Sequence, residues 1–542
     1  MKKRILWSIL IMLAVAVFFV GCGGTEEEPT QEPVAEATEA PDAEPTEEAS
    51  APTATSVPEE PKVLKVRLYG DIQNLDPAFR ISENDEVVSN AVMNGLVRYC
   101  PNSYELCNQL AEEIEQSEDG LEVRFKLREG VMWHNGYGEL TTEDVKYSYE
   151  RFIDPELSAD YADDWATLDY VEIIDDYNGI IHLTEPYAPL WNSTMPVNSG
   201  NIICKKFVEE IGVESFATNI IGTGPYMFSE WRPQEKVILK KNPDYWGEAP
   251  YWDEIQLIPI EDDKAGEVAL ESGDLDFGLI SIQSVERFKD NADFKVWSKP
   301  SLRYSWVALN VQHPKLQDPN VRWAIIYGID VPSIIQAAYM GQVERTCALI
   351  PPGLTGYWAE APCYERDVDK AKEYLAKAGL ESLDIRLDLQ DTAEDRIWAE
   401  IIQQNLAEVG INVELNPMDS STYWTTTFGE QACENNELAV SGYSMQNDPA
   451  WATMWFTCDQ VGVWNAMCWC NEEYDRLHRL AMITLDSDER DEMYIEMQKL
   501  WDEAAHTVWV TNGARVYGYQ TDIAPATTPN GKPQVEFFMP AE

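Results

Sequence analysis

The stretch that decides the fold is VRFKLREGVMWHNGYGELTTEDVKYSYERFIDP, Val123 to Pro155. Apolar and basic side chains alternate from its first residue to Leu127, which is the period of a half-buried β-strand. His134-Asn135-Gly136 then supplies turn residues. Glu143 and Asp144 stand where the first turn of a helix favours acids. The stretch therefore predicts a strand, a turn and a helix that ends before the final proline.

This stretch resembles the signature of the family 5 extracellular solute-binding proteins, which are the peptide- and nickel-type receptors of ABC importers. The signature reads approximately F-x-L-R-x-G-V-x-F/W-H-D-G-x-x-[LF]-T-A-x-D-V-x-[FY]-S-x-x-R. The matching positions are Phe125, Leu127, Arg128, Gly130, Val131, Trp133, His134, Gly136, Leu140, Thr141, Asp144, Val145, Tyr147, Ser148 and Arg151. Asn135 stands where the signature has Asp. The signature identifies a fold and aligns no catalytic constellation.

Further blocks in the family order extend the resemblance over about residues 63–520. They are N-L-D-P at 74–77, I-G-T-G-P-Y at 221–226, Y-W-D-E-I at 251–255, L-E-S-G-D-L-D-F at 270–277, and A-L-N with V-R-W-A-I-I-Y-G-I-D within 308–330. The resemblance implies a two-lobed α/β fold of the type II periplasmic-binding-protein class. It also implies an extra subdomain, and closure on a ligand at a hinge.

The resemblance also predicts how the chain divides. We expect lobe I to comprise residues 63–98, 215–302 and 513–542, with an inserted subdomain at 99–214 and lobe II at 303–512. Within lobe I, an alternating strand is expected at 63–69 and an amphipathic helix at 87–97. Within lobe II, a strand at 383–389, a helix at 393–409 and a strand at 411–415 form a unit that is typical of an α/β lobe.

The chain has 542 residues, too many for one hydrophobic core, and a formal net charge of −55. Such a charge repels nucleic acid and anionic lipid headgroups, so we expect no nucleic-acid partner. It suits an exported, highly soluble protein or a cationic ligand.

The N-terminus has the pattern of an exported lipoprotein. Lys2-Lys3-Arg4 precedes an apolar run that ends in Phe19-Val20-Gly21-Cys22, which resembles a bacterial lipobox with Phe19 in the place of the usual Leu. We expect residues 1–22 to be a signal peptide and Cys22 to carry a diacylglyceryl group. An uncleaved anchor helix is the alternative, but the apolar run is short for a membrane span. Residues 23–62, rich in Glu, Pro, Thr and Ala, are expected to form a disordered acidic tether.

Ten cysteines in an exported chain favour disulfides. Local pairs are plausible for Cys100 with Cys107 and for Cys347 with Cys363. A Cys458–Cys470 bridge is implied by the resemblance to dipeptide-binding relatives. A zinc site at Cys458, Cys468 and Cys470 is the rival interpretation, although the chain has only five His and no C-x-x-C. Lipidation of Cys22 would leave an odd cysteine over, for which Cys204 is the candidate.

The alternative to a binding protein is an enzyme, such as a secreted hydrolase. Acid pairs such as Asp163-Asp164 and Asp175-Asp176 could serve a glycosidase, but in a chain with 95 acids they indicate solvated surface. The sequence contains neither G-x-S-x-G nor H-E-x-x-H. His134 could be a nickel ligand, yet its place in the signature favours a hydrogen-bonded turn residue. We therefore expect no catalytic residues, no cofactor and no metal.

The ligand stretch is expected at Gly442 to Trp455, GYSMQNDPAWATMW, where Asp448-Pro449 matches the family's D-P. In dipeptide- and oligopeptide-binding relatives, an Asp three residues before this position pairs with the peptide's ammonium, and here it is Met445. The dipeptide binders hold the carboxylate with an Arg near a loop that here reads Gln390-Asp391-Thr392. Because an unpaired buried charge is costly, extended peptides are favoured over free dipeptides.

The aromatic residues Tyr443, Trp451, Trp455, Trp464 and Trp469 offer faces for sugar rings, so an oligosaccharide is the second candidate ligand, and core packing is the other explanation for them. The predicted ligand-binding residues are Tyr304, Trp306, Asp391, Tyr443, Met445, Gln446, Asn447, Asp448 and Trp451. The resemblance implies a monomeric peptide receptor outside the cell membrane. We expect a lipid anchor to hold it there, and we expect it to serve an ABC permease and its ATPase.

Overall fold

The computed structural model describes residues 60–79, 82–428 and 432–541. The predicted signal peptide, the lipidation site Cys22 and the tether as far as residue 59 lie outside the described residues. Within the described part of the chain, no helix combines the length and the apolar character that crossing a membrane requires.

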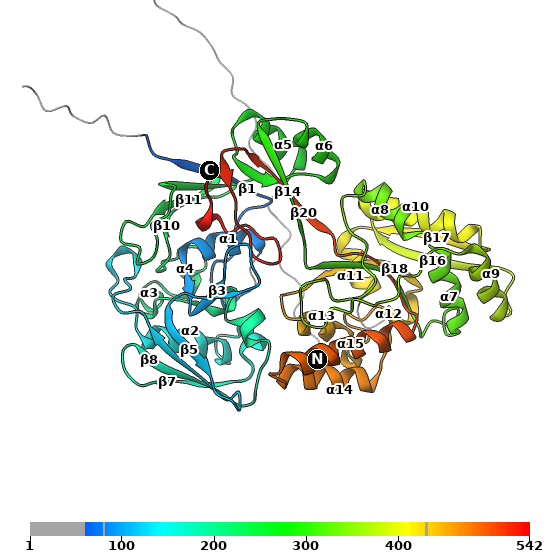
Figure 1. The fold of residues 1–542 in the computed structure, drawn as a ribbon, viewed down its shortest axis with the longest axis horizontal. Coiled ribbons are helices and arrows are strands. Elements are labelled where there is room, and N and C mark those ends of the chain that lie inside the picture. The colour runs from blue at the N-terminus through cyan, green and yellow to red at the C-terminus, as the bar shows by residue number, and fades with distance from the viewer. Residues whose placement is uncertain (1–59, 80–81, 429–431, 542) are drawn as a thin grey trace, which may run out of the picture. The chain divides into compact units, whose positions relative to one another are not determined.

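The largest sheet has seven strands in the order β10-β11-β12-β1-β13-β20-β14 and lies in the upper left of Figure 1. Its strands are β1 (Val63–Leu68), β10 (Tyr226–Arg232), β11 (Lys236–Lys241), β12 (Glu254–Pro259), β13 (Phe277–Leu279), β14 (Phe294–Pro300) and β20 (Ala514–Gln520). Strands β1 and β12 pair in parallel from Val63 opposite Glu254. The helices α5 (Asp263–Ser272) and α6 (Val285–Lys289) cover part of it with Leu270 and Phe288. All seven strands come from ranges assigned to lobe I.

A four-stranded antiparallel sheet carries the stretch that opened the sequence analysis. Its order is β5 (Ala111–Gln116), β6 (Glu122–Leu127), β8 (Asn178–Leu183) and β7 (Leu168–Ile173). The predicted alternation is confirmed, because Val123, Phe125 and Leu127 are buried while Arg124 is exposed. The helix α2 (Thr142–Glu150) begins with a capping box between Thr141 and Asp144 and packs on β7.

His134 is a hydrogen-bonded turn residue, as predicted. Its backbone N–H donates to the carbonyl of Gly222 at 2.9 Å, and the Gly222 N–H donates to its Nδ1 at 3.2 Å. Its Nε2 lies 2.9 Å from the carbonyl oxygen of Gly224. Burial lowers the pKa of His134 to about 4, so the ring is neutral near pH 7. It joins the signature stretch to the I-G-T-G-P-Y block.

A third sheet, of five strands, forms the centre of the part assigned to lobe II, on the right of Figure 1. Its order is β17 (Ile411–Met418), β16 (Leu383–Gln390), β18 (Leu438–Ser444), β15 (Arg303–Leu309) and β19 (Thr507–Thr511). The predicted strand–helix–strand unit is present, since β16 and β17 pair in parallel through α10 (Ala393–Ala407). The other helices of this part are α7 (Pro319–Gly328), α8 (Val331–Tyr339), α9 (Val368–Lys377), α11 (Ser420–Thr427), α12 (Ala432–Asn435), α13 (Ala450–Thr453), α14 (Glu472–Ile483) and α15 (Ser487–Glu503).

The helix predicted at 87–97 begins and ends earlier, as α1 (Glu83–Val92). Ser82 caps it, and Asp85 closes the capping box, so the first turn is fixed ahead of the apolar residues. It ends because the next residues form β2 (Asn94–Gly95), which pairs with β9 (Asn201–Ile202). A side chain at Gly95 would lie 2.8 Å from the Gly200 carbonyl oxygen, so this approach requires glycine.

The remaining short elements connect or cap these sheets. They are β3 (Val97–Tyr99), β4 (Leu106–Asn108), β21 (Ile523–Ala524), β22 (Met539–Pro540), α3 (Lys205–Ile211) and α4 (Val213–Phe216).

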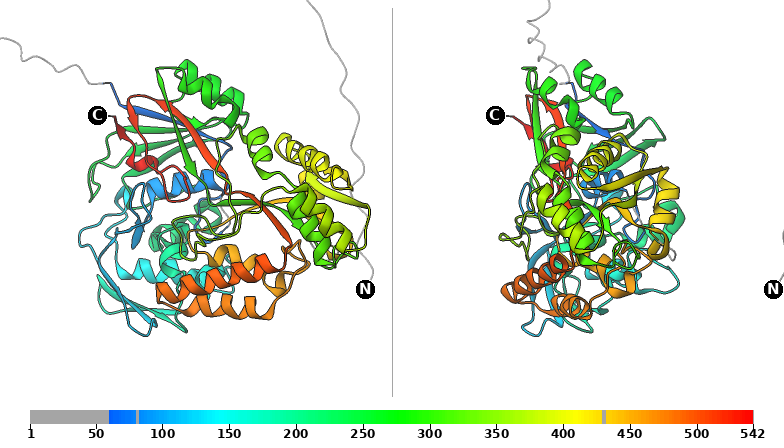
Figure 2. Two further views of the ribbon diagram at one scale, coloured as in Figure 1. Left: turned by 45° about the vertical axis from the view of Figure 1, so that its right-hand side comes forward. Right: turned by 90° about the vertical axis from the view of Figure 1, so that its right-hand side faces the viewer.

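Two strand pairs carry the chain between the seven-stranded and five-stranded sheets. Strand β14 continues into β15 through Ser301 and Leu302, and β19 continues into β20 through Asn512 and Gly513. The Ser301 hydroxyl donates to the Asn512 carbonyl at 2.8 Å, which joins the two crossings. Gly513 has φ 68°, a conformation that favours glycine. Figure 2 shows these connecting strands in two further views. Hinges form at a few residues where the chain passes from one lobe to the other, as it does here.

The disulfides Cys100–Cys107, Cys347–Cys363 and Cys458–Cys470 confirm the predicted pairs. A fourth, Cys433–Cys468, was not predicted from the sequence. The alternative zinc site at Cys458, Cys468 and Cys470 is wrong, because all three sulfurs are in disulfides. Among the described cysteines, Cys204 alone is free, as expected, and it is buried.

We expect Cys204 to react with a thiol reagent only after unfolding. Burial raises the pKa of the Cys204 thiol to about 11, so little nucleophilic thiolate forms in the native protein at neutral pH. Maleimide labelling without reductant, followed by intact-mass measurement, should show no label on Cys204 in native buffer and one in denaturant. Rapid native labelling of Cys204, or additional labels from the eight paired cysteines, would contradict this arrangement.

Candidate functional site

In the segment after β18, Gln446, Asn447 and Asp448 lie close to residues that come before residue 215 in the chain. Strand β18 ends at Ser444, and Asp448-Pro449 starts the helix α13. The Asp448 side chain accepts a hydrogen bond from the Ala450 N–H at 3.0 Å, which fixes the turn into this helix. The strand thus ends in a largely buried loop, and the aspartate of the D-P pair fixes the turn into the next helix.

Asp448 is fully buried and forms an ion pair with Arg490 of α15. The Arg490 Nη2 lies 2.9 Å and 2.8 Å from the two carboxylate oxygens of Asp448. The Tyr494 hydroxyl lies 3.4 Å from Asp448, and Arg490 also donates to the Ala481 carbonyl at 2.8 Å. The carboxylate is therefore satisfied by groups of lobe II.

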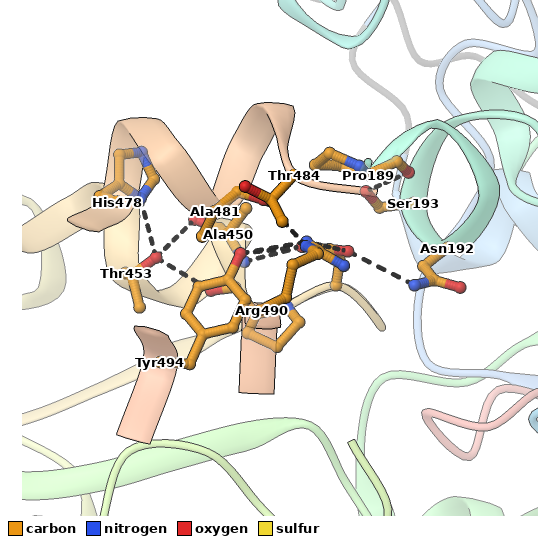
Figure 3. A network of polar contacts seen from close by, with 12 residues as sticks. Pro189, Asn192, Ser193, Ala450, Thr453, His478, Ala481, Thr484, Arg490 and Tyr494 are labelled. Atoms are coloured by element: carbon orange, nitrogen blue, oxygen red, sulfur yellow. Dashed lines mark hydrogen bonds and ion pairs between the residues drawn. The ribbon is translucent and has the colours of Figure 1, made fainter. Parts of the chain in front are cut away.

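Asn192 extends this network to the range 99–214, which the sequence assigns to an inserted subdomain. It lies on the short helix η4 (Leu190–Thr194), and its Nδ2 donates to Asp448 at 3.4 Å. Figure 3 shows Asn192 approaching the Arg490 and Tyr494 side chains from the opposite side. The Tyr99 hydroxyl donates to the Asn192 carbonyl at 2.5 Å, and the Ala188 N–H donates to the Met482 carbonyl at 2.8 Å. Asp448 thus joins two parts of the fold, and its lone pairs are already used.

Beside this contact lies a cavity of about 40 Å³ that Gln446 and Asn447 line from lobe II. Residues of lobe I and of the inserted subdomain form its other walls. They are Glu86, Asn90, Tyr99, Tyr161, Asp164, Pro196, Val197, Asn198, Ser199, Thr528, Asn530 and Lys532. A cavity of this size holds about three water-sized groups, so the cleft is closed in this conformation. We name it the cleft cavity.

The lobe I wall was missed by sequence reasoning. Glu86 and Asn90 lie four residues apart on α1, so both point to the same side of the helix. Lys532, which comes from the C-terminal segment, forms an ion pair with Glu86. No local motif marks either position, because the wall is assembled from segments that lie more than 400 residues apart in the chain. The Asn530-Gly531 turn is the one local signal nearby.

Two buried carboxyl groups stand at or near this cavity. Burial raises the pKa of Asp164 to about 7, and the neighbouring Asp163 adds to the rise while a hydrogen bond from Ser199 opposes it. Burial likewise raises the pKa of Glu536 to about 7, against the effect of Arg98. Asp164 lines the cleft cavity itself. Both groups therefore change charge close to neutral pH.

Three of the predicted ligand residues are core residues in this structure. Tyr304 and Trp306 of β15 are fully buried in the aromatic core of lobe II, and Met445 is buried beside them. Tyr304 stacks on Trp306 with ring centroids 5.4 Å apart. The Met445 N–H donates to the Leu302 carbonyl at 2.9 Å, which continues the strand pairing. None of the three lines the cleft cavity.

The other predicted residues lie elsewhere on lobe II. Asp391 is exposed and pairs with Arg396 at 2.5 Å. Tyr443 is half-buried and donates to the Trp464 carbonyl at 2.5 Å, and Trp451 is also half-buried. Neither lines the cleft cavity, so of the predicted residues the structure brings only Gln446 and Asn447 to its wall.

The predicted aromatic residues divide into two groups. Trp469 packs in the core against Tyr474, Trp501 and His506, and so has a structural role. Trp464 is 40% exposed, with its ring centroid 5.9 Å from that of Trp455. We use the name aromatic patch for four neighbouring residues of lobe II, the half-buried Tyr443, Trp451 and Trp455 and the exposed Trp464. Within the described residues, no group of three or more His, Cys, Asp or Glu is arranged to hold a metal ion.

The family model of the bacterial extracellular solute-binding proteins, family 5, matches residues 105–463. The chain belongs to this family. It is 26% identical over 485 residues to di/tripeptide-binding protein 2 of Pseudomonas aeruginosa (strain UCBPP-PA14), with 83% of this chain and 89% of that protein covered. These relatives bind solutes and are not enzymes, so the prediction of a non-enzymatic protein is confirmed.

Two solved structures place the fold. The periplasmic binding protein DppA from Helicobacter pylori, in complex with the peptide STSA, superimposes with TM-score 0.72 at 25% identity, over 87% of this chain and 97% of that one. The substrate-binding protein CtaP from Listeria monocytogenes gives TM-score 0.81 at 21% identity, over 89% and 100%. The predicted two-lobed α/β fold of the family 5 proteins is therefore confirmed.

Proposed function

We propose that this family 5 protein is the peptide receptor of an ABC importer, which captures its ligand outside the membrane and delivers it to a permease driven by an ATPase. The observation that carries the proposal is the cleft cavity, which both lobes and the inserted subdomain line together. A ligand enclosed there would contact all three parts at once. The named relatives that bind di- or tripeptides, and the DppA complex with a tetrapeptide, support a peptide as the ligand class.

The two charged residues that anchor a dipeptide in relatives are missing here, which favours extended peptides over free dipeptides. Met445 is buried in the lobe II core and offers no carboxylate to an ammonium. Asp391 is neutralised by Arg396 and lies away from the cleft cavity. Affinity would therefore come from hydrogen bonds to the peptide backbone and from pockets of low selectivity.

The lobes must separate to admit any peptide, because the cleft cavity holds about three water-sized groups. The two strand crossings at Ser301–Leu302 and Asn512–Gly513 are the segments at which such a hinge motion would be accommodated. In this proposal the Asp448–Asn192 contact breaks on opening, while the Asp448–Arg490 pair stays within lobe II.

An oligosaccharide is the second candidate ligand, and the aromatic patch favours it. Its exposed Trp464 offers a ring face of the kind that stacks on sugars. Substitutions in the aromatic patch distinguish the two candidate ligands. Tyr443→Ala or Trp451→Ala should remove most of the affinity for a sugar, but little of the affinity for a peptide held in the cleft cavity.

The ligand is tested by native mass spectrometry of the purified protein, followed by denaturation and identification of what is released. We expect a monomer that carries a ladder of peptides longer than two residues. Scattering after ligand removal and refolding should show a larger radius of gyration than the loaded protein. A hexose-spaced series would overturn the peptide assignment in favour of the second candidate, and release of free dipeptides would refute the preference for extended chains.

Anchoring at Cys22 is tested by the thiol count already described for Cys204. A mature lipoprotein unfolded without reductant should carry one reactive thiol, because the Cys22 sulfur is in a thioether. The Cys22→Ala precursor should carry the same number and lose incorporation of labelled fatty acid. Two thiols in the membrane-extracted wild-type protein would refute the anchor.

A further inference from the structure

A second cavity of about 40 Å³ adjoins the cleft cavity, and we call it the rear cavity. The two are neighbours, because they share the lining residues Asn90, Tyr99, Pro196, Val197 and Thr528. The other wall of the rear cavity comes from β3 and from the C-terminal segment around Gln534 and Glu536.

Buried polar atoms without partners gather on the walls of both cavities. In the rear cavity they are Gln534 Oε1, Glu536 Oε2 and Arg98 Nε, and in the cleft cavity Asn447 Oδ1. None of the four has a hydrogen-bond partner among the described residues. Gln534 is 5% exposed and Asn447 is 6% exposed. Buried polar atoms are nearly always hydrogen-bonded, so a cluster of four in one site indicates a ligand that supplies the missing partners.

The chemistry of these atoms defines what such a ligand presents. Three of the four accept hydrogen bonds, and Arg98 Nε alone donates. The protein's net charge of −55 disfavours an anion here. The rear cavity has about 40 Å³, so it suits a small terminal group of a ligand. A compact nitrogen group with several N–H donors fits.

We propose that the rear cavity receives a hydrogen-bond-donating nitrogen group of the bound peptide, an ammonium, guanidinium or carboxamide, held by Gln534 and Glu536 with Asn447 at the entrance. This inference rests on the proposed peptide function and deepens it. The group replaces the ammonium contact that Met445 does not supply. Lys532 is paired with Glu86. The charge of Arg98 acts on Glu536 but leaves the Glu536 Oε2 atom without a hydrogen bond.

The test uses purified full-length protein and pools of tetrapeptides with one position fixed. Lysine is compared with norleucine, and asparagine with leucine, because each pair has nearly equal shape and differs in its N–H donors. We expect the lysine and asparagine pools to bind at least about tenfold more tightly by calorimetry, since a buried acceptor is left unpaired by the donor-free partner.

Gln534→Leu should abolish this preference while the free protein keeps or gains thermal stability, because the substitution removes an unpartnered buried amide. Gln460→Leu is the matched control, since Gln460 Oε1 is also unpartnered but lines neither cavity. The control should keep the preference. If Gln534→Leu does not fold, Asn447→Leu provides the same comparison at the entrance.

Two failures are distinguishable. If pools with and without donors bind wild-type protein equally, or if Gln534→Leu retains the preference, the rear cavity is only hydrated space and this inference is wrong while peptide binding stands. If no pool binds at all, the proposed peptide function falls and this inference with it.

Discussion

Arg490→Met is expected to destabilise the protein by about 3–5 kcal/mol, because it leaves the Asp448 carboxylate buried without its counter-ion. Asp448 is 0% exposed, and Arg490 supplies both short contacts to its oxygens. Methionine fills a similar volume, so the loss measures the ion pair rather than a cavity. Urea unfolding monitored by tryptophan fluorescence gives the comparison, with the unfolding transition of lobe II expected to move to lower denaturant.

The control is Arg476→Met, which removes an ion pair between Arg476 and Glu473 on the surface of α14. Both side chains of that pair are about half exposed, and such pairs contribute about 0–1 kcal/mol. The double variant Asp448→Asn with Arg490→Met should recover part of the loss, since the unpaired charge is gone. An Arg490→Met protein as stable as the Arg476→Met control would show that the buried ion pair between Asp448 and Arg490 does not stabilise the fold.

Much of the fold follows from local sequence patterns. The alternation that ends at Leu127, the capping residues before α2 and the parallel unit around α10 are set within a few residues, and they appear as predicted. The α1 helix shows where this fails. Its apolar residues indicate a later helix, but Ser82 fixes the first turn, and pairing of β2 with β9 ends the helix early. That pairing joins segments about a hundred residues apart and leaves no local signal.

The predicted ligand residues are only partly brought together by the fold, for a related reason. The D-P motif marks the loop from which Gln446 and Asn447 line the cleft cavity. The motif's own Asp448, however, is used within the fold by Arg490, whose position 42 residues later is visible only in three dimensions. Tyr304 and Trp306 of β15 face the lobe II core, and no pattern in the sequence distinguishes a core aromatic residue from one in a binding site. The opposite wall, which includes Glu86, Asp164 and Lys532, is built from segments that lie far apart in the sequence.

Asp164→Asn is expected to change how stability depends on pH. The pKa of Asp164 is raised from 3.8 to about 7 in the folded protein, chiefly by burial, so the folded state holds a proton that the unfolded state releases. The stability associated with this proton is fully present below about pH 4 and is lost as pH rises through about 7. One pKa unit corresponds to about 1.4 kcal/mol, so the loss reaches about 4 kcal/mol in alkaline buffer.

Asparagine imitates the protonated acid and keeps an acceptor for the Ser199 hydroxyl, so the variant should not suffer this loss. The quantity to measure is the difference in unfolding free energy between Asp164→Asn and wild type, without ligand, across this pH range. It should be small in acid and should increasingly favour the variant as pH rises. Asp163→Asn, at the exposed neighbouring position, should show a much smaller trend. A difference that is flat with pH, or one that favours wild type in alkaline buffer, would mean that Asp164 is ionised in the folded protein, and its wall of the cleft cavity would then be anionic at neutral pH.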